Sequence, residues 1–210
     1  MVGELRFARA AVSCSIAEFA SVWDAMPDPT PNPMNTSTFI RRRQGTWGEV
    51  REYHFTGQVS HGLGNIDNAP AAVRRCVEDA RHRAGPKDAA LYTGAHVNWY
   101  DGGGAWMDKH QDVATDERGA GLPIYSYTFL RGGLAYRDFA VYDCKTAKEA
   151  VATIPLRHGD MLAMAGDFQR HLWHSVPKQG SKRFASQQRL NVTVRPWGDM
   201  KVVTEKLPRR

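Results

Sequence analysis

Two histidines and a carboxylate stand at spacings that suit a metal ion. His110 and Asp112 form a His-x-Asp tripeptide, and His174 follows far along the chain. In an extended chain, residues two apart point to the same side of the strand. One imidazole nitrogen and one carboxylate oxygen can therefore converge on one ion, and His174 is the candidate for a third ligand from another strand.

Two histidines and one carboxylate on one face form the facial triad of non-haem Fe(II) oxygenases, which leaves coordination positions open for a co-substrate and dioxygen. A His-x-Asp tripeptide alone is a weak signal, because it arises often by chance. A second one, His158-Gly159-Asp160, contains a glycine and is interpreted as a turn with local hydrogen bonds. His171 would face away from His174 in a strand, so it is interpreted as a surface or nucleic-acid-facing residue.

Alternate polar residues near the C-terminal end favour an anionic ligand. In a strand, Arg189, Asn191, Thr193 and Arg195 share one face. Two guanidinium groups on an inward face need an anionic occupant, since buried unpaired cations are costly. A dicarboxylate would satisfy both arginines through bidentate pairs. Ion pairing on an exposed strand is the alternative.

The elements that must position these residues are mainly strands. After residue 90, short β-rich runs alternate with Gly, Asp and Pro, which is typical of a β-sandwich or barrel. The expected strands are Ala95–Tyr100, Ile124–Leu130, Phe139–Tyr142, Ala152–Leu156, Met161–Met164, Leu172–Val176 and Leu190–Arg195. Asn98 and Tyr100 add a second pair of polar side chains on one strand face.

Two helices precede these strands. Ser15-Ile16-Ala17-Glu18 reads as a capping box that opens a helix, which the proline-rich stretch 27–33 ends. A second helix is predicted from Ala69 to Ala84, with Asn68 as the N-cap and Gly85-Pro86 as the stop. We expect an N-terminal part of helices and hairpins (1–90) packed on a β core (91–200), then a basic tail (201–210), with the helices bracing one face of the sheet.

Composition narrows the class of protein. The chain has 210 residues, which suits one domain, and no apolar run long enough to span a membrane. Its three cysteines form no C-x-x-C pair, which argues against a disulfide framework or a zinc knuckle. No secretory leader is recognisable, so we expect an intracellular protein, cytoplasmic or nuclear.

The charge is unevenly distributed. The net charge is +6, and residues 168–210 carry ten basic and two acidic side chains. Arg41, Arg42 and Arg43 form a second basic cluster. Basic clusters favour polyanionic partners such as nucleic acid, although a solvated basic face on an ordinary enzyme is the alternative.

Taken together, the motifs resemble the AlkB family of Fe(II)- and 2-oxoglutarate-dependent dioxygenases. The similarity spans about residues 40–196, and the twelve-residue spacing from Asn98 to His110 resembles the DNA-repair branch. The matching elements are Asn98-x-Tyr100, His110-x-Asp112, Pro123-Ile124 with Ser126, Arg137-Asp138-Phe139, His158-Gly159-Asp160, His174, and Arg189-x-Asn191-x-Thr193-x-Arg195. The stretches 42–48 and 53–57 resemble that branch's nucleotide-recognition hairpins.

The resemblance implies a mainly β protein with flanking helices and a double-stranded β-helix, or jelly-roll, core. It implies Fe(II) bound by His110, Asp112 and His174, with 2-oxoglutarate and dioxygen as co-substrates. The implied 2-oxoglutarate residues are Asn98, Tyr100, Arg189, Asn191 and Arg195. The implied activity is oxidative demethylation of N-alkylated bases in DNA or RNA, on a base that is flipped out or unpaired.

The same resemblance implies a set of residues that meet the nucleic acid, and we expect the protein to act as a monomer. The implied substrate-binding residues are Arg42, Arg43, Gln44, Trp47, Tyr53, Phe55 and Arg137. Repair enzymes of the family carry an acidic residue two positions after the metal aspartate, where this chain has Ala114. The modified base therefore stays open, and so do a protein or small-molecule hydroxylase and a nucleic-acid-binding module without catalysis.

Overall fold

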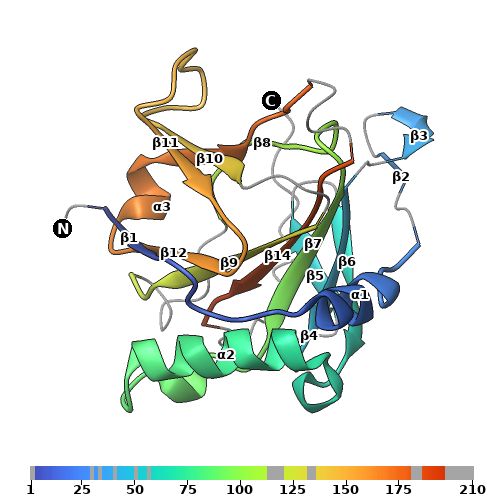
Figure 1. Ribbon diagram of the computed structural model, residues 1–210. Coiled ribbons are helices and arrows are strands. Elements are labelled where there is room, and N and C mark those ends of the chain that lie inside the picture. The colour runs from blue at the N-terminus through green and yellow to red at the C-terminus, as the bar shows by residue number, and fades with distance from the viewer. Residues whose placement is uncertain are drawn as a thin grey trace.

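Two β-sheets form the body of the protein in this computed structural model (Figure 1). The structure describes residues 3–28, 31–32, 35–39, 42–49, 52–55, 58–112, 121–131, 136–180 and 186–196. The larger sheet has, in spatial order, β1 (Glu4–Ala8), β12 (Asp160–Ala165), β9 (Ile124–Arg131), β14 (Gln188–Val194), β7 (Ala95–Asp101), β4 (Arg42–Trp47), β6 (Gln58–Gly64) and β5 (Glu52–Phe55). The smaller sheet has β11 (Ala152–Leu156), β10 (Arg137–Tyr142), β13 (Trp173–Val176) and β8 (Met107–His110).

Strand pairing is antiparallel in both sheets apart from the parallel pair β4 and β6. A separate hairpin is made by β2 (Pro31–Asn32) and β3 (Asn35–Phe39). The larger and the smaller sheet pack face to face through side chains of β9, β10 and β12. This arrangement confirms the expected mainly β fold with a jelly-roll core.

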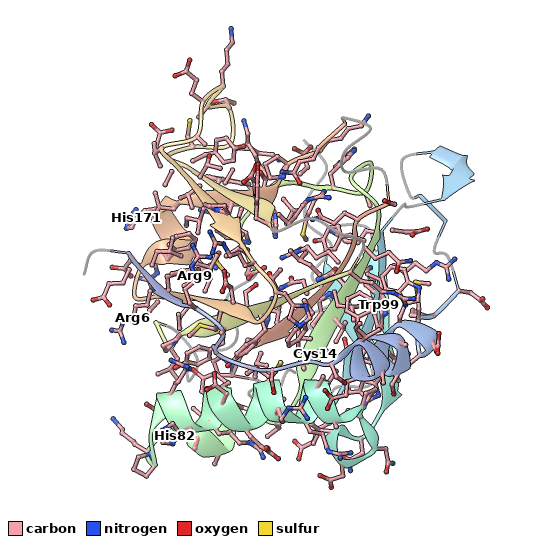
Figure 2. The ribbon with its side chains drawn as sticks, viewed as in Figure 1. Arg6, Arg9, Cys14, His82, Trp99 and His171 are labelled. Carbon is pink, nitrogen blue, oxygen red and sulfur yellow. The ribbon has the colours of Figure 1, made fainter. Side chains whose placement is uncertain are left out.

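Helices cover the outer face of the larger sheet (Figure 1). They are α1 (Ile16–Asp24) and α2 (Ala71–Ala84), whose buried side chains join one apolar core with β7, β9 and β14. Trp99 on β7 points toward α1 (Figure 2), and its indole N–H donates to the carbonyl of Val22 at 3.0 Å. The expectation that two helices brace one face of the sheet is confirmed.

The inner face of the larger sheet changes character from one side to the other. Toward β12 it is apolar, with Ile124, Leu162 and Met164 against Phe139 and Val141 of the smaller sheet. Toward β4 the same inner face is polar, because alternate positions of β4, β7, β9 and β14 are registered side by side. These polar residues are Arg42, Gln44, Thr46, His96, Asn98, Tyr100, Ser126, Thr128, Arg189, Asn191 and Thr193.

The seven strands predicted after residue 90 are present, but the sequence pattern does not mark several other strands. Among these are β1, an edge strand that pairs with β12, and β8, which carries the first histidine of the His-x-Asp motif. Neither ELRFA nor MDKH contains an apolar run, so the hydrophobic pattern does not mark them. Partner strands, and not their own composition, make these segments extended.

The helix predictions are confirmed with one correction. The capping box at Ser15 is present, since its hydroxyl accepts from the Glu18 N–H at 3.2 Å while its own N–H donates to the Glu18 carboxylate at 2.8 Å. Asn68 is not the N-cap of the second helix: it ends the 3₁₀ turn Ile66–Asn68, and Pro70 takes the cap position in an extended conformation. Among the described residues, none of the helices is both long and apolar enough to cross a lipid bilayer.

The His158-Gly159-Asp160 segment is a turn, as the sequence predicts. Gly159 has a φ of 83°, which favours glycine. Its neighbours bind beyond the turn: His158 Nε2 lies 2.8 Å from the carbonyl oxygen of Cys14, and Asp160 accepts from the Ala10 N–H at 3.2 Å. The turn therefore holds the N-terminal segment against the sheet.

Candidate active site

Strand pairing brings two of the predicted metal ligands together. His110 on β8 lies opposite His174 on β13 in the smaller sheet. The ring centroids are 4.1 Å apart at an interplanar angle of 54°. The register of these two strands, rather than any local motif, is therefore what places two imidazoles side by side.

Asp112 completes the cluster from just beyond β8. Its Oδ1 lies 3.7 Å from His110 Nε2 and 4.0 Å from His174 Nε2. One ligand atom from each of the three residues lies within 4.8 Å of the others. The strand ends at His110, so alternation along β8 does not by itself orient Asp112.

Neighbouring groups orient the two rings. His110 Nδ1 lies 2.8 Å from the backbone oxygen of Asp108, so a proton on Nδ1 leaves Nε2 available as a ligand. His174 stacks on Phe139, with centroids 5.3 Å apart at 20°, and Phe168 lies at 6.1 Å. These contacts hold both imidazoles in place without occupying the nitrogens that face Asp112.

The electrostatics keep the cluster in its ligand form. Burial acts to raise the pKa of Asp112, but Arg195 and the neighbouring histidines outweigh it and lower that pKa to about 2. Burial, together with His110, lowers the pKa of His174 to about 3, and burial also lowers the pKa of His110. At neutral pH the site therefore offers one carboxylate and two neutral imidazoles, the protonation states in which these groups bind a divalent cation.

A buried arginine provides a second functional feature of the same interior. Arg189 is 1% exposed, lies with its guanidinium 4.8 Å from the Tyr100 ring centroid, and donates from Nη2 to Thr128 Oγ1 at 3.1 Å. Its Nε and Nη1 have no hydrogen-bond partner among the described residues. Burial lowers the pKa of Arg189, with partial compensation by Tyr100. Such orphaned buried donors fit the carboxylate of a bound ligand.

The remaining predicted cofactor residues lie on the same polar face. Asn191 pairs in register with Asn98 and donates to Ser126 Oγ at 2.8 Å. Within the described part of the chain, Asn98 Oδ1 is buried without a hydrogen-bond partner. Arg195 Nη2 lies 3.4 Å from Asp112 Oδ1 and so links this face to the histidine cluster. All five predicted residues therefore line one interior that also contains the three candidate ligands.

The predicted substrate residues do not gather in one place. Arg42 and Gln44 are buried on the inner face of β4, where Arg42 Nη2 donates to Gln44 Oε1 at 3.2 Å. Arg43 is half-buried and donates to the carbonyl of Pro27. Trp47 is 3% exposed and packs against Trp99 in the core behind the sheet. Trp47 is therefore not available to stack on a base, and Arg42 is not a surface phosphate contact.

Arg137 is likewise structural in its contacts. It is fully buried and donates to the backbone carbonyls of Gly102, Ala105 and Pro177. Burial, with a smaller effect of Arg189, lowers its pKa to about 10. The guanidinium is committed to three carbonyl groups in this conformation, so the structure does not support the predicted substrate contact of Arg137.

Some residues named from the sequence have no described side chain, and His171 lies at the surface. Tyr53 and Phe55 lie on β5, but their side chains are outside the described residues, as is Ala114. His171 is exposed at the end of the short helix α3 (Phe168–His171) and points outward (Figure 2), as expected for a residue that is not a ligand. Arg189 and Arg195 are interior residues, so part of the C-terminal basic excess is not on the surface.

Two further groups near the site were not anticipated. His96 lies on the inner face of β7, with Nδ1 3.2 Å from Thr46 Oγ1, and burial followed by Arg195 and Arg42 lowers its pKa to about 3. The spacing of two among His96, Asn98 and Tyr100 is the sequence signal that marks His96 as inward. Gln169 Oε1 accepts from the Asp112 N–H at 2.8 Å, a long-range contact for which the sequence carries no signal.

Comparisons with known proteins agree with this geometry. Residues 9–195 match the family model of the 2OG-Fe(II) oxygenase superfamily. The solved structure of OsALKBH1 superposes with a TM-score of 0.57 at 16% sequence identity, covering 93% of this chain and 97% of that one. A search of the curated proteins by sequence gave no match. The structural likeness bears on the fold alone, whereas the family match covers most of the chain, including all three candidate ligands, and the chain therefore belongs to the 2OG-Fe(II) oxygenase superfamily.

Proposed function

We propose that this protein is an Fe(II)- and 2-oxoglutarate-dependent dioxygenase that demethylates N-alkylated bases in nucleic acid. The observation that carries the proposal is the meeting of two features in one interior. The His110, Asp112 and His174 cluster joins, through Arg195, a face on which Arg189 has two buried donors that find no partner in the described part of the chain. One end suits a metal and the other suits the carboxylate of a ligand that also reaches the metal.

In this proposal His110, Asp112 and His174 hold the iron. Arg189, with Tyr100 beneath it, receives the distal carboxylate of 2-oxoglutarate, while Asn98 and Arg195 lie toward the end that binds the metal. Asn191 is held by Ser126 and the Tyr127 carbonyl, so it supports the neighbouring Asn98. Arg189 then gains an anionic partner for its two buried donors that have none among the described residues, while Arg195 keeps its contact with Asp112.

When bound, the iron supplies the activation of dioxygen, which converts 2-oxoglutarate to succinate and carbon dioxide and inserts one oxygen atom into a substrate C–H bond. An N-methyl group so hydroxylated loses formaldehyde and leaves the unmodified base. The protein's own contribution is positional. Phe139 and Phe168 shield the His174 ring, and the paired strands β8 and β13 fix the two imidazoles before any ligand arrives.

Nucleic acid is favoured as substrate by the motif resemblance to the AlkB family and by the fold shared with OsALKBH1. Arg170 and Lys178 are exposed, basic and close in sequence to His174, so they are available to phosphate groups. The burial of Trp47 and Arg137 favours a second candidate, a hydroxylase of a protein or small molecule, because it removes two of the residues assigned to a base.

The test is a mass-spectrometric assay of methylated DNA and RNA oligonucleotides with Fe(II), 2-oxoglutarate and ascorbate. We expect loss of 14 Da per methyl group, with release of formaldehyde and succinate. His110→Ala should abolish the mass loss and the release of formaldehyde and succinate. His171→Ala, which removes an exposed histidine near the site, should leave all three unchanged. Succinate formation without any change in the oligonucleotides would favour the second candidate.

A further inference from the structure

Asp112 is the one candidate ligand that strand pairing does not hold. His110 and His174 are a register pair, whereas Asp112 lies two residues past the last residue of β8. Its carboxylate contacts Arg195, but that contact leaves the backbone of residue 112 unconstrained. Some other contact must set where the Asp112 Cα lies relative to the two imidazoles.

Two hydrogen bonds from one segment supply that constraint. The Asp112 N–H donates to Gln169 Oε1 at 2.8 Å, and Gln111 Nε2 donates to the carbonyl of Leu172 at 3.3 Å. Gln169 and Leu172 belong to α3 and the residue that follows it, and β13 with His174 begins directly afterwards. The same short segment therefore contacts both the Gln111 side chain and the N–H of the Gln111–Asp112 peptide, and it leads into the third ligand.

The Gln169 amide is itself oriented. Its Nε2 donates to Met164 Sδ at 3.3 Å, and Met164 is a buried residue of β12 in the apolar half of the interior. With the amide nitrogen turned toward the sulfur, the amide oxygen faces the Asp112 N–H. Gln169 is half-buried, so this contact is also partly sheltered from competing water.

We infer that Gln169 is a positioning residue for the metal ligand Asp112. It fixes the backbone of residue 112 while Arg195 restrains the carboxylate, so that the carboxylate oxygen meets both imidazoles at ligand spacing. The inference rests on the proposed metal site. Groups that orient ligands in this way contribute about 10- to 100-fold to metal affinity.

The experiment is an anaerobic titration of the metal-free full chain with Co(II). Calorimetry measures the affinity, and the visible absorption bands of bound Co(II) report its coordination geometry. Gln169→Met keeps the length of the side chain and removes the acceptor oxygen. Gln169→Asn keeps an amide that is one methylene too short to reach. For both we expect about 10- to 100-fold weaker Co(II) binding and altered bands.

Gln169→Glu keeps an acceptor oxygen at the same reach, so its absorption bands should return to those of the wild-type protein. His171→Ala, a change at the exposed last residue of α3, should leave affinity and bands unchanged and controls for damage to the helix. Melting of the metal-free variants, followed by circular dichroism, separates unfolding from loss of the site.

Loss of the metal site and loss of the Gln169 contact give different results in this titration. If His110→Ala and His174→Ala bind Co(II) as tightly as the wild-type protein, the metal site itself is wrong. If these variants lose Co(II) while folded Gln169→Met and Gln169→Asn bind it with wild-type affinity and bands, the metal site stands and the role of Gln169 is overturned.

Discussion

Asp112 and Arg195 form a buried pair, with 3.4 Å between Oδ1 and Nη2. The side chains are 13% and 3% exposed, so water screens the interaction little. The pair joins two regions that are distant in sequence, the end of β8 and the residue after β14. Burial acts to raise the pKa of this carboxyl group, and the Arg195 guanidinium makes the largest opposing contribution, ahead of His174 and His110.

The first prediction concerns this pair. Arg195→Met should destabilise the metal-free protein, because breaking a buried ion pair leaves its partner uncompensated and costs about 3–5 kcal/mol. Asp112→Asn combined with Arg195→Met should cost less than the sum of the two single changes. Urea unfolding of the four proteins at pH 7 gives the coupling energy, and a value near zero would mean that the pair has no energetic role.

Arg189 leads to the second prediction. Arg189→Met should weaken 2-oxoglutarate binding by about 2–5 kcal/mol, since one partner of a buried charge pair is lost. The stability of the ligand-free protein should not fall, because the guanidinium has two buried donors without partners in the described chain. Calorimetric titration of the Mn(II)-loaded protein measures the affinity, and thermal unfolding measures the stability.

A matched pair of ligands sharpens this test. The wild-type protein should prefer 2-oxoglutarate to 2-oxobutyrate, which lacks the distal carboxylate. Arg189→Met should bind both equally weakly. If the variant still discriminates between them, the distal carboxylate binds elsewhere.

Much of this architecture could be predicted from the sequence because it depends on local patterns. The alternation of polar and apolar residues in Arg189–Arg195 predicts a strand with one polar face. The structure has strand β14 at this place, with that face buried. The three candidate metal ligands follow from residue type and order along the chain, and the fold brings them together. The capping box at Ser15 is a four-residue signal, and the helix begins where that signal predicts.

What could not be predicted depends on tertiary packing. Trp47 and Arg137 have residue types that suit nucleic-acid recognition, yet the fold uses one as core and the other as a cross-link between loops. Residue type reports that a side chain is aromatic or basic, but not whether the fold buries it against other elements. The contact between Gln169 and Asp112 spans 57 residues and has no periodic signature.

The third prediction concerns the contact between the helices. Glu18 Oε1 on α1 lies 2.7 Å from Arg75 Nη1 on α2. Arg75, followed by the Ser15 N–H, lowers the pKa of Glu18 to about 2 from 4.5. Since the folded-state pKa is the lower one, this stabilisation is complete above about pH 4.5 and is lost as pH falls toward 2.

Glu18→Gln should therefore lower the free energy of unfolding by about 0.2–1 kcal/mol at pH 7, the range for a solvent-exposed pair, and by progressively less below pH 4.5. Glutamine can still accept from the Ser15 N–H, so the change isolates the charge. Glu78→Gln on the exposed side of α2 is the matched control. Equal differences at pH 7 and pH 3 would show that the charge on Glu18 does not contribute.

The last prediction separates structure from substrate recognition at Arg137. Its guanidinium joins the loop after β7, through Gly102 and Ala105, to Pro177 after β13. Hydrogen bonds from a charged donor contribute about 1.5–3 kcal/mol each, so Arg137→Met should lower the free energy of unfolding by about 2 kcal/mol or more, which urea titration measures.

Fluorescence anisotropy with a labelled oligonucleotide should give wild-type affinity for the folded variant, because the guanidinium faces backbone carbonyls and not the surface. Arg170→Ala, by contrast, removes an exposed charge and should weaken that affinity with little change in stability. The opposite pattern, with affinity lost and stability kept in Arg137→Met, would require Arg137 to leave its carbonyl partners when nucleic acid binds.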